Sequence, residues 1–445
     1  MNESGVRLKK KSSPYGVKVP ERKLTAGKPV ERAPLPEKAI ISLHQNLGAP
    51  GQALVKRGDR VLTGQKIGDS DKFVSAPVHA TVSGEITGTT MIVNPPTAQP
   101  VEALVITSDG ADEWVQLEPI EKPDMLSAQE ILHRIREAGL VGLGGAAFPA
   151  HIKLAPPKDC RIDTVILNGC ECEPYATSDH RVMLESGEEV LSGLNIIRKL
   201  LTPQATYIAI EDNKEDAIDC MEELIAAMGL EKDIKIVPLE SKYPMGAERI
   251  LIKLLLGREV PIGGLPLNVG VVVHNVSTAK AIHEAVVEGK PLIERVITVT
   301  GAVRDPKNLL VRFGTPIGSL IEYCGGTVGT ANKVILGGPM MGFAQFDLGF
   351  PTVKGTNSVV VKEDTAAREH SCIRCGRCIE ICPMHLMPTL LAKYSKAGRY
   401  DECKAAYIDN CFECGVCAYV CPANIPIVQY VEMAKRELSK KAARK

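Results

Sequence analysis

The sequence contains the stretch Cys372-Ile-Arg-Cys375-Gly-Arg-Cys378-Ile-Glu-Ile-Cys382-Pro383, and its spacing recurs in Cys411-Phe-Glu-Cys414-Gly-Val-Cys417-Ala-Tyr-Val-Cys421-Pro422. Each run reads C-x2-C-x2-C-x3-C-P, the bacterial pattern for [4Fe-4S] clusters, in which the fourth Cys ligates the other cluster. Zinc sites require no such proline, and disulfides require an oxidising compartment. We therefore expect two crossed ligand sets: Cys372, Cys375, Cys378 and Cys421 for one cluster, and Cys411, Cys414, Cys417 and Cys382 for the other.

The composition limits the remaining possibilities. At 445 residues the chain should hold about three or four domains. Lys+Arg and Asp+Glu balance at 53 each, and there are one Trp and seven Phe, which argues against nucleic-acid binding. Fourteen Cys fit a reducing cytoplasm. No secretory signal or stretch of about 18 apolar residues is evident, so any membrane association should be peripheral.

The front of the chain combines a basic arm with a glycine-punctuated unit. Residues 1–38 are Pro-rich and aperiodic, which indicates an extended arm over other domains, and a solvated tail is favoured over any contact of its lysines with lipid. Its Lys9-Lys10-Lys11 run is a candidate contact for acidic lipid. Short apolar segments separated by Gly over 39–120 predict a small all-β unit. It resembles the barrel-sandwich hybrid of biotinyl and lipoyl domains; Lys72 falls near their attachment position, and we expect it to be unmodified.

An alternation of strands and helices begins with the capping box Ser127-Ala-Gln-Glu130, which opens an amphipathic helix ending at Gly139. This pattern predicts a mostly parallel sheet over 124–290, covered on both faces, with ligands at the carboxyl ends of its strands. The expected strands are Asp163–Asn168, Thr206–Ile210, Ile234–Pro238 and Val269–His274. The expected helices are Lys214–Met228, Ala247–Leu256 and Ser277–Val287.

Residues 291–350 predict a small α+β module. Arg295–Gly301 and Lys333–Gly337 are its expected strands, and Thr315-Pro316 should begin a short helix with Thr315 as the N-cap. No constellation of titratable residues stands out, so we expect a spacing role. Beyond it, helices at Pro388–Lys396 and Tyr400–Tyr407 should complete an α-helical ferredoxin domain over 362–432, followed by a striped helix from Ile427 and a basic tail at 433–445.

Iron–sulfur clusters exchange single electrons whereas NADH gives a hydride, and a flavin can do both. The loop Gly139-Leu-Val-Gly142-Leu-Gly144-Gly145-Ala-Ala-Phe148-Pro-Ala-His-Ile-Lys153 lacks the Rossmann fingerprint, yet its consecutive N–H groups suit a phosphate, with Lys153 as the countercharge. A tight structural turn is the alternative. Asn168-Gly-Cys170-Glu171-Cys172-Glu173 places amide and carboxylate groups at a strand end. Its two Cys have a poor cluster spacing and are expected to be buried thiols rather than zinc ligands.

These segments, with Tyr243-Pro-Met-Gly246-Ala-Glu248 and Val273-His-Asn275-Val-Ser-Thr278, resemble the four FMN/NADH motifs of the complex I 51-kDa flavoprotein family. The resemblance implies that the glycine loop and its Lys hold the FMN phosphate, that two Asn hold the flavin, and that the remaining residues line the NADH side, with Glu248 catalytic. Carried over, the positions are Gly142, Gly144, Gly145, Lys153, Asn168 and Asn275, then Phe148, Glu171, Glu173 and Glu248.

Three positions depart from the complex I pattern: an Asp is Cys170, a Glu pair is Ala247-Glu248, and an Asn pair is His274-Asn275. With two ferredoxin motifs and the β-rich front, nearly the whole chain resembles the C subunit of the Rnf (Rsx) ion-translocating oxidoreductase, a multidomain α/β and α+β chain. The resemblance implies a Rossmann-like flavin domain and an SLBB (β-grasp-like) module at 291–350.

The same resemblance implies NAD(H) as the substrate and FMN and two [4Fe-4S] clusters as cofactors. It implies a peripheral place on the cytoplasmic side of the membrane, beside a B-type ferredoxin subunit and integral subunits. The alternatives are a soluble diaphorase subunit of a hydrogenase or dehydrogenase, and a flavin-less electron-transfer adaptor, which Cys170 at the Asp position favours.

Overall fold

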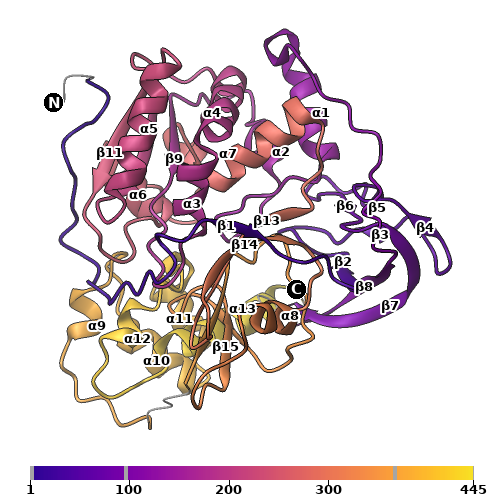
Figure 1. Ribbon diagram of the computed structural model, residues 1–445. Coiled ribbons are helices and arrows are strands. Elements are labelled where there is room, and N and C mark those ends of the chain that lie inside the picture. The colour runs from indigo at the N-terminus through magenta and orange to yellow at the C-terminus, as the bar shows by residue number, and fades with distance from the viewer. Residues whose placement is uncertain (1–4, 95–98, 364–367, 444–445) are drawn as a thin grey trace.

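The computed structural model describes residues 5–94, 99–363 and 368–443, and these ranges form four β-sheets. Figure 1 shows a helix-covered sheet at the top, a β-rich unit at the right, a mixed sheet beneath, and the helices that carry the cysteine motifs at the bottom.

The β-rich unit confirms the all-β prediction for the front of the chain. One sheet has the strand order β2-β8-β7-β4 and a smaller one the order β3-β5-β6. Both contribute to one core, in which Ile41, Ile67, Val78 and Ile106 are buried. The strands are β2 (Lys38–Ser42), β3 (Gln52–Ala53), β4 (Arg60–Val61), β5 (Lys66–Asp69), β6 (Val78–His79), β7 (Gly84–Asn94) and β8 (Gln99–Ser108).

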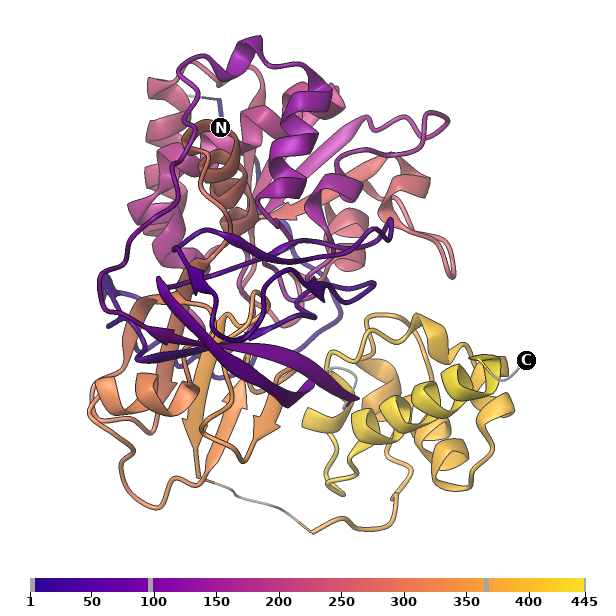
Figure 2. The same ribbon diagram turned by 90° about the vertical axis from the view of Figure 1, so that its right-hand side faces the viewer.

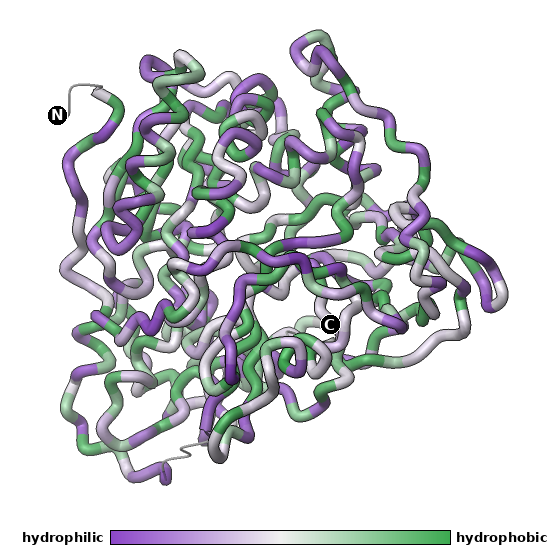
Figure 3. The backbone as a smooth tube through the Cα atoms, viewed as in Figure 1, coloured by the Kyte–Doolittle hydropathy of each residue, from purple (hydrophilic) through white to green (hydrophobic). Residues whose placement is uncertain are grey.

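The α/β domain is built on an all-parallel sheet in the order β11-β10-β9-β12. Within β9 (Thr164–Asn168), Val165 and Leu167 enter one core and Ile166 enters another, because successive side chains point to opposite faces. Helices therefore cover both faces, and the strands are largely green in Figure 3. The other strands are β10 (Ala205–Glu211), β11 (Ile234–Leu239) and β12 (Val271–Asn275).

All four predicted strands are present, although β12 starts two residues late because Pro266–Val269 forms a 3-10 helix, η2. The capping box of α1 is confirmed: Ser127 and Glu130 bond each other's main chain. Two helices that the sequence did not predict, α3 and α4, lie between β9 and β10. The helices are α1 (Ala128–Glu137), α2 (Ala150–Lys153), α3 (Ser178–Glu185), α4 (Gly187–Leu201), α5 (Glu215–Ala227), α6 (Glu248–Leu256), α7 (Val276–His283), the π-helix η3 (Glu284–Glu288) and the 3-10 helix η1 (Pro123–Met125).

The mixed sheet has the order β1-β14-β13-β17-β15-β16. The prediction that Thr315 caps its helix is wrong: the cap position is Pro316, and the Thr315 hydroxyl donates to the Arg312 carbonyl instead. The elements are β1 (Val30–Arg32), β13 (Glu294–Gly301), β14 (Lys307–Arg312), α8 (Ile317–Tyr323), β15 (Lys333–Leu336), β16 (Phe343–Gln345) and β17 (Ser358–Lys362).

The cysteine motifs lie in a helical unit beside the mixed sheet (Figure 2). Its core includes Leu391, Ile408, Val431 and Ala434. The expected striped helix is α13, and it continues to Ala443 through most of the segment expected as a basic tail. No helix in the described part of the chain combines the length and apolarity of a membrane span. The elements are α9 (Arg377–Glu380), α10 (Pro388–Lys396), α11 (Tyr400–Ala405), η4 (Ile408–Asn410), α12 (Val416–Tyr419) and α13 (Ile427–Ala443).

The described part of the basic arm is extended and lies against other parts of the chain, as an arm over other domains would. It runs beside β11 with parallel bridges from Arg7 and Lys11, and β1 then joins the mixed sheet beside β14. The Lys11 ammonium donates to two carbonyls at the end of α6, and Lys10 pairs with Asp212 at 2.8 Å. Two of the three lysines proposed for lipid contact therefore have protein partners.

Candidate functional site

The glycine loop is fixed by contacts to two other elements. The Leu143 N–H donates to the Thr278 hydroxyl of α7 at 2.9 Å, and Arg295 of β13 donates to the Leu143 carbonyl at 3.0 Å. Gly145 has a φ of +122°, which side chains rarely adopt. These contacts hold the main chain of the loop in one conformation, and no side chain extends from Gly142, Gly144 or Gly145.

Asn168 and Asn275 lie side by side, because they end the neighbouring parallel strands β9 and β12 in register. The Asn168 amide donates to the Gly246 carbonyl at 2.8 Å, and the Asn275 amide donates to Asp179 at 2.6 Å. A Cβ on Gly144 would lie 3.3 Å from the Asn275 Cβ. The glycine loop, both strand ends and the segment around Gly246 thus meet at the carboxyl edge of the sheet.

Lys153 and Glu248 form an ion pair at this edge. Their Nζ and Oε1 atoms are 2.7 Å apart, and the side chains are 30% and 37% exposed. Lys153 ends α2 and Glu248 begins α6, so the pair joins the glycine loop to the Gly246 segment. Half-buried Phe148 is held through its main chain, whose carbonyl accepts from the Gly142 N–H at 2.8 Å.

The two carboxylates after β9 are bound by main-chain donors. Glu171 accepts from the N–H groups of Asp179 and His180 at the start of α3. Glu173 accepts from the N–H groups of Met340 and Met341, at 3.1 and 2.8 Å. Burial raises the pKa of the Glu173 carboxyl to about 7, although those two donors oppose the shift.

The mixed sheet therefore does more than space the other domains, and the expected spacing role needs correction. Its Arg295 supports the glycine loop, and its 338–342 segment binds Glu173. A Cβ on Gly415, inside the second cysteine motif, would lie 2.7 Å from the Met340 carbonyl oxygen. The segment consequently lies between the carboxyl edge and the second motif.

The two cysteine motifs share one backbone conformation. Arg374 and Glu413 have φ of +57° and +60°, and the following Gly376 and Gly415 have +78° and +80°. In each motif the first Sγ accepts an N–H from two residues on, at 3.4 Å. The sequence repeat is thus a structural repeat, in which main-chain N–H groups point toward sulfur.

The fourth cysteine of each motif lies with the other motif. Cys382 lines a cavity with Cys411, Cys414 and Cys417, closed by apolar side chains that include Leu391 and Val431. The charge of Cys421, in turn, raises the pKa of Cys378, after burial as the main cause. Cys382 thus lies with the three cysteines of the second motif, and the full crossed pairing stays a prediction. Cys372 and Cys375 are exposed, whereas burial raises the pKa of the Cys414 thiol to about 12.

Four models of known protein families match segments of this chain. Residues 135–284 match the model of the Nuo51 FMN-binding domain, 11–111 the RnfC barrel sandwich hybrid domain, 296–344 the SLBB domain and 371–425 the 4Fe-4S dicluster domain.

Full-length relatives agree. The chain is 48% identical over 422 residues to the C subunit of the proton-translocating ferredoxin:NAD(+) oxidoreductase complex of Clostridium ljungdahlii, with 94% of this chain and 91% of that protein covered. It is 43% identical over 434 residues to the C subunit of the Na(+)-translocating ferredoxin:NAD(+) oxidoreductase complex of Acetobacterium woodii, with 95% and 96% covered. The chain belongs to the C subunits of ion-translocating ferredoxin:NAD+ oxidoreductases.

A solved chain of an NAD+-reducing [NiFe]-hydrogenase in the H2-reduced state aligns at a TM-score of 0.49 and 18% identity, covering 71% of this C subunit and 61% of that chain.

Since this protein has an FMN-binding domain and a 4Fe-4S dicluster domain, its cofactors are FMN and [4Fe-4S] clusters. The carboxyl edge fits the flavin, because it offers a glycine loop without side chains, the Lys153 cation and two strand-end amides. Cys170 is a buried thiol and Cys172 a half-buried one, and burial raises the pKa of both. In the described ranges no group of His, Cys, Asp and Glu converges as on a single metal ion.

Sequence reasoning missed several residues that position the site in the C subunit. The Lys23 ammonium, from the arm, donates to the carbonyls of Glu171, Glu173 and Ala176 at 2.7–2.9 Å. Lys214 donates to the Cys170 carbonyl at 2.6 Å. Both lysines fix the loop after β9 through its main chain, and no spacing motif marks them in the sequence.

Proposed function

We propose that this C subunit exchanges a hydride with NAD(H) and single electrons with a partner, as the peripheral subunit of a membrane-bound ferredoxin:NAD+ oxidoreductase. The proposal depends above all on one observation: the glycine loop, Lys153 and the two strand-end Asn meet at one sheet edge, and the second cysteine motif lies across the 338–342 segment from it.

FMN, when bound, converts between hydride and single-electron exchange. The N–H groups of Gly144 and Gly145 would bind the phosphate, while the Gly142 N–H stays bonded to the Phe148 carbonyl, and Lys153 would turn from Glu248 to neutralise the phosphate. Asn168 and Asn275 hydrogen-bond and orient the flavin at the strand ends.

The NADH side is formed by Phe148, Glu171, Glu173 and Glu248. Phe148 supplies an apolar face that excludes water, and the two glutamates after β9 hold the surrounding main chain through α3 and the 338–342 segment. Glu248 faces the nicotinamide once Lys153 has turned to the phosphate, and it is the catalytic residue of the proposal.

The eight motif cysteines hold two [4Fe-4S] clusters in the crossed sets predicted from their spacing. The set of Cys411, Cys414, Cys417 and Cys382 lies on the flavin side, since Gly415 packs against the Met340 carbonyl. The other set includes exposed Cys372 and Cys375, so it faces the partner. The buried set would therefore exchange electrons with the flavin, and the exposed set with the partner.

The partner is a B-type ferredoxin subunit, and integral subunits anchor the complex with this chain on the cytoplasmic side. The named relatives move H+ or Na+, and the ion crosses the integral subunits. Antibody detection should find the chain in washed membranes of a strain with the integral subunits and in the soluble fraction of a strain without them. A soluble chain in both strains would favour a soluble diaphorase.

Rapid mixing with NADH tests the redox proposal. The anaerobically purified chain should contain about eight irons and one FMN, and NADH should reduce the flavin before the clusters. Glu248→Gln should retain FMN yet slow reduction by NADH, while dithionite, which bypasses hydride transfer, should reduce its clusters at the wild-type rate.

Glu259→Gln is the matched control, because Glu259 is an exposed carboxylate just after α6 that pairs with Lys253. Its kinetics should equal those of the wild type. Wild-type kinetics in Glu248→Gln would mean that Glu248 only provides a charge at the start of α6. A chain without flavin or NADH-dependent reduction would instead be an electron-transfer adaptor.

A further inference from the structure

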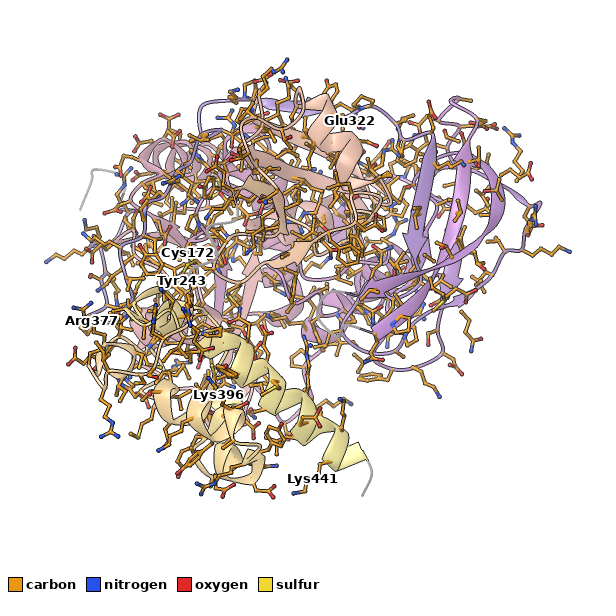
Figure 4. All side chains as sticks on the ribbon, turned by 90° about the horizontal axis from the view of Figure 1, so that it is seen from below. Cys172, Tyr243, Glu322, Arg377, Lys396 and Lys441 are labelled. Atoms are coloured by element: carbon orange, nitrogen blue, oxygen red, sulfur yellow. The ribbon has the colours of Figure 1, made fainter. Side chains whose placement is uncertain are left out.

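Tyr243 lies between the flavin domain and the cysteine motifs. It follows β11, its side chain is 2% exposed, and it lies next to Cys172 above the C-terminal helices in Figure 4. The basic arm fixes its main chain: Val17 donates to the Tyr243 carbonyl at 2.8 Å and accepts its N–H at 2.9 Å. These two hydrogen bonds fix the backbone position from which the Tyr243 side chain extends.

The Tyr243 hydroxyl has no hydrogen-bond partner among the described residues. A buried donor without an acceptor costs about 1–3 kcal/mol, so such groups are rare and call for a specific explanation. An acceptor that arrives with a cofactor would remove this cost.

Three acidic groups influence the phenol: Glu173, Cys172 and Cys414. Burial first and these charges second raise the pKa of Tyr243, so the hydroxyl keeps its proton and remains a donor. Both oxygens of Glu173 already accept from Met340 and Met341. Of the three, Cys414 alone belongs to a proposed cluster ligand set.

We propose that the Tyr243 hydroxyl donates a hydrogen bond to the sulfur shell of the cluster held by the Cys411 motif, and thereby positions and tunes this cluster beside the flavin. The inference depends on the proposed ligand sets and adds a residue of the α/β domain to them. Reduction adds one negative charge to the cluster, so a hydrogen-bond donor stabilises the reduced state more than the oxidised one. Hydrogen bonds to sulfur are among the factors that set cluster potentials. The hydroxyl should therefore raise the potential of this cluster.

The test is a redox titration of the cofactor-loaded chain, followed by electron paramagnetic resonance, which resolves the two clusters. Cys414→Ser first identifies the signal of the flavin-side cluster. Tyr243→Phe should then lower the potential of that cluster by about 59 mV, equivalent to a tenfold change in its oxidised-to-reduced ratio, and leave the other cluster unchanged. Tyr323→Phe, on exposed Tyr323 of α8, is the matched control and should move neither.

A second variant, expected to shift the cluster potential in the opposite direction, keeps the test decisive if Tyr243→Phe does not fold. Fluorotyrosine at position 243 keeps the ring and its hydroxyl but makes the phenol a stronger donor, so the same potential should rise. Unchanged potentials in both variants, or equal shifts of both clusters, would overturn the role of Tyr243. If Cys414→Ser instead left both signals intact, the ligand sets would be wrong, and that failure is distinct from the first.

Discussion

Replacing Lys153 with Ala should weaken FMN binding by a factor that the ion pair with Glu248 limits. A charge-assisted bond from an ammonium to a phosphate contributes about 1.5–3 kcal/mol. Lys153 must first leave Glu248, and because both side chains are about one-third exposed that pair contributes only about 0–1 kcal/mol. The net loss is roughly 0.5–3 kcal/mol, or roughly twofold to 150-fold in the dissociation constant.

Glu248→Gln should have the opposite effect, because the ammonium no longer has a carboxylate competing with the phosphate. FMN should bind up to about fivefold more tightly, the equivalent of about 1 kcal/mol. The double variant should bind like Lys153→Ala, since it has no ammonium left to release. This non-additivity separates competition between the two residues from independent contacts.

The assay is the quenching of flavin fluorescence on titration with the flavin-stripped chain, at low and high salt. Lys158→Ala removes an exposed Lys from the turn after α2 and should leave the affinity unchanged. Undiminished FMN binding in Lys153→Ala would place the phosphate away from the glycine loop. Weaker binding in Glu248→Gln would show that Glu248 contacts the cofactor rather than competing with it.

Four further outcomes are expected. Cys421→Ser should damage the cluster of the first motif, and loss of the signal that belongs to its own motif would refute the crossed pairing. The pKa of Glu173 rises from 4.5 to about 7 on folding. Its stabilising contribution is thus complete below pH 4.5 and lost as pH rises through 7, on the order of 3 kcal/mol; urea midpoints of Glu173→Gln should fall less over that range. Lys23→Met leaves three carbonyls without their ammonium and should cost about 1.5–3 kcal/mol in unfolding experiments, whereas Lys28→Met, which loses a partly exposed pair with an aspartate, should cost about 1 kcal/mol or less. Intact mass spectrometry should find Lys72 unmodified, and an added lipoyl or biotinyl mass would contradict this.

Local patterns in the sequence predicted the parts of the fold that depend on neighbouring residues. The run of apolar residues in β9 and the capping box at Ser127 are properties of short segments, and both are present. The repeated cysteine spacing likewise predicted two matching motifs, because each is a local conformation that residues such as Gly376 make possible.

Contacts between distant segments could not be predicted in this way. Lys23 reaches Glu171 across 148 residues and Arg295 reaches Leu143 across 152. Nothing near Lys23 distinguishes it from the other lysines of the arm. The resemblance placed Lys153 and Glu248 in one site, but only the geometry shows that they bind each other and therefore compete with a phosphate.

The docked arm has a consequence for how the chain is made. Arg7 pairs with Glu222, and Val30 aligns with Asn308, so the arm leaves the ribosome hundreds of residues before its partners. Closing such long loops costs entropy before any contact compensates, so docking is a late step of folding. At about 5–20 residues per second, translation keeps this segment undocked for at least ten seconds. During that time its basic residues are available to chaperones and proteases. Until the arm docks, the loop after β9 also lacks the hydrogen bonds that Lys23 donates to its carbonyls.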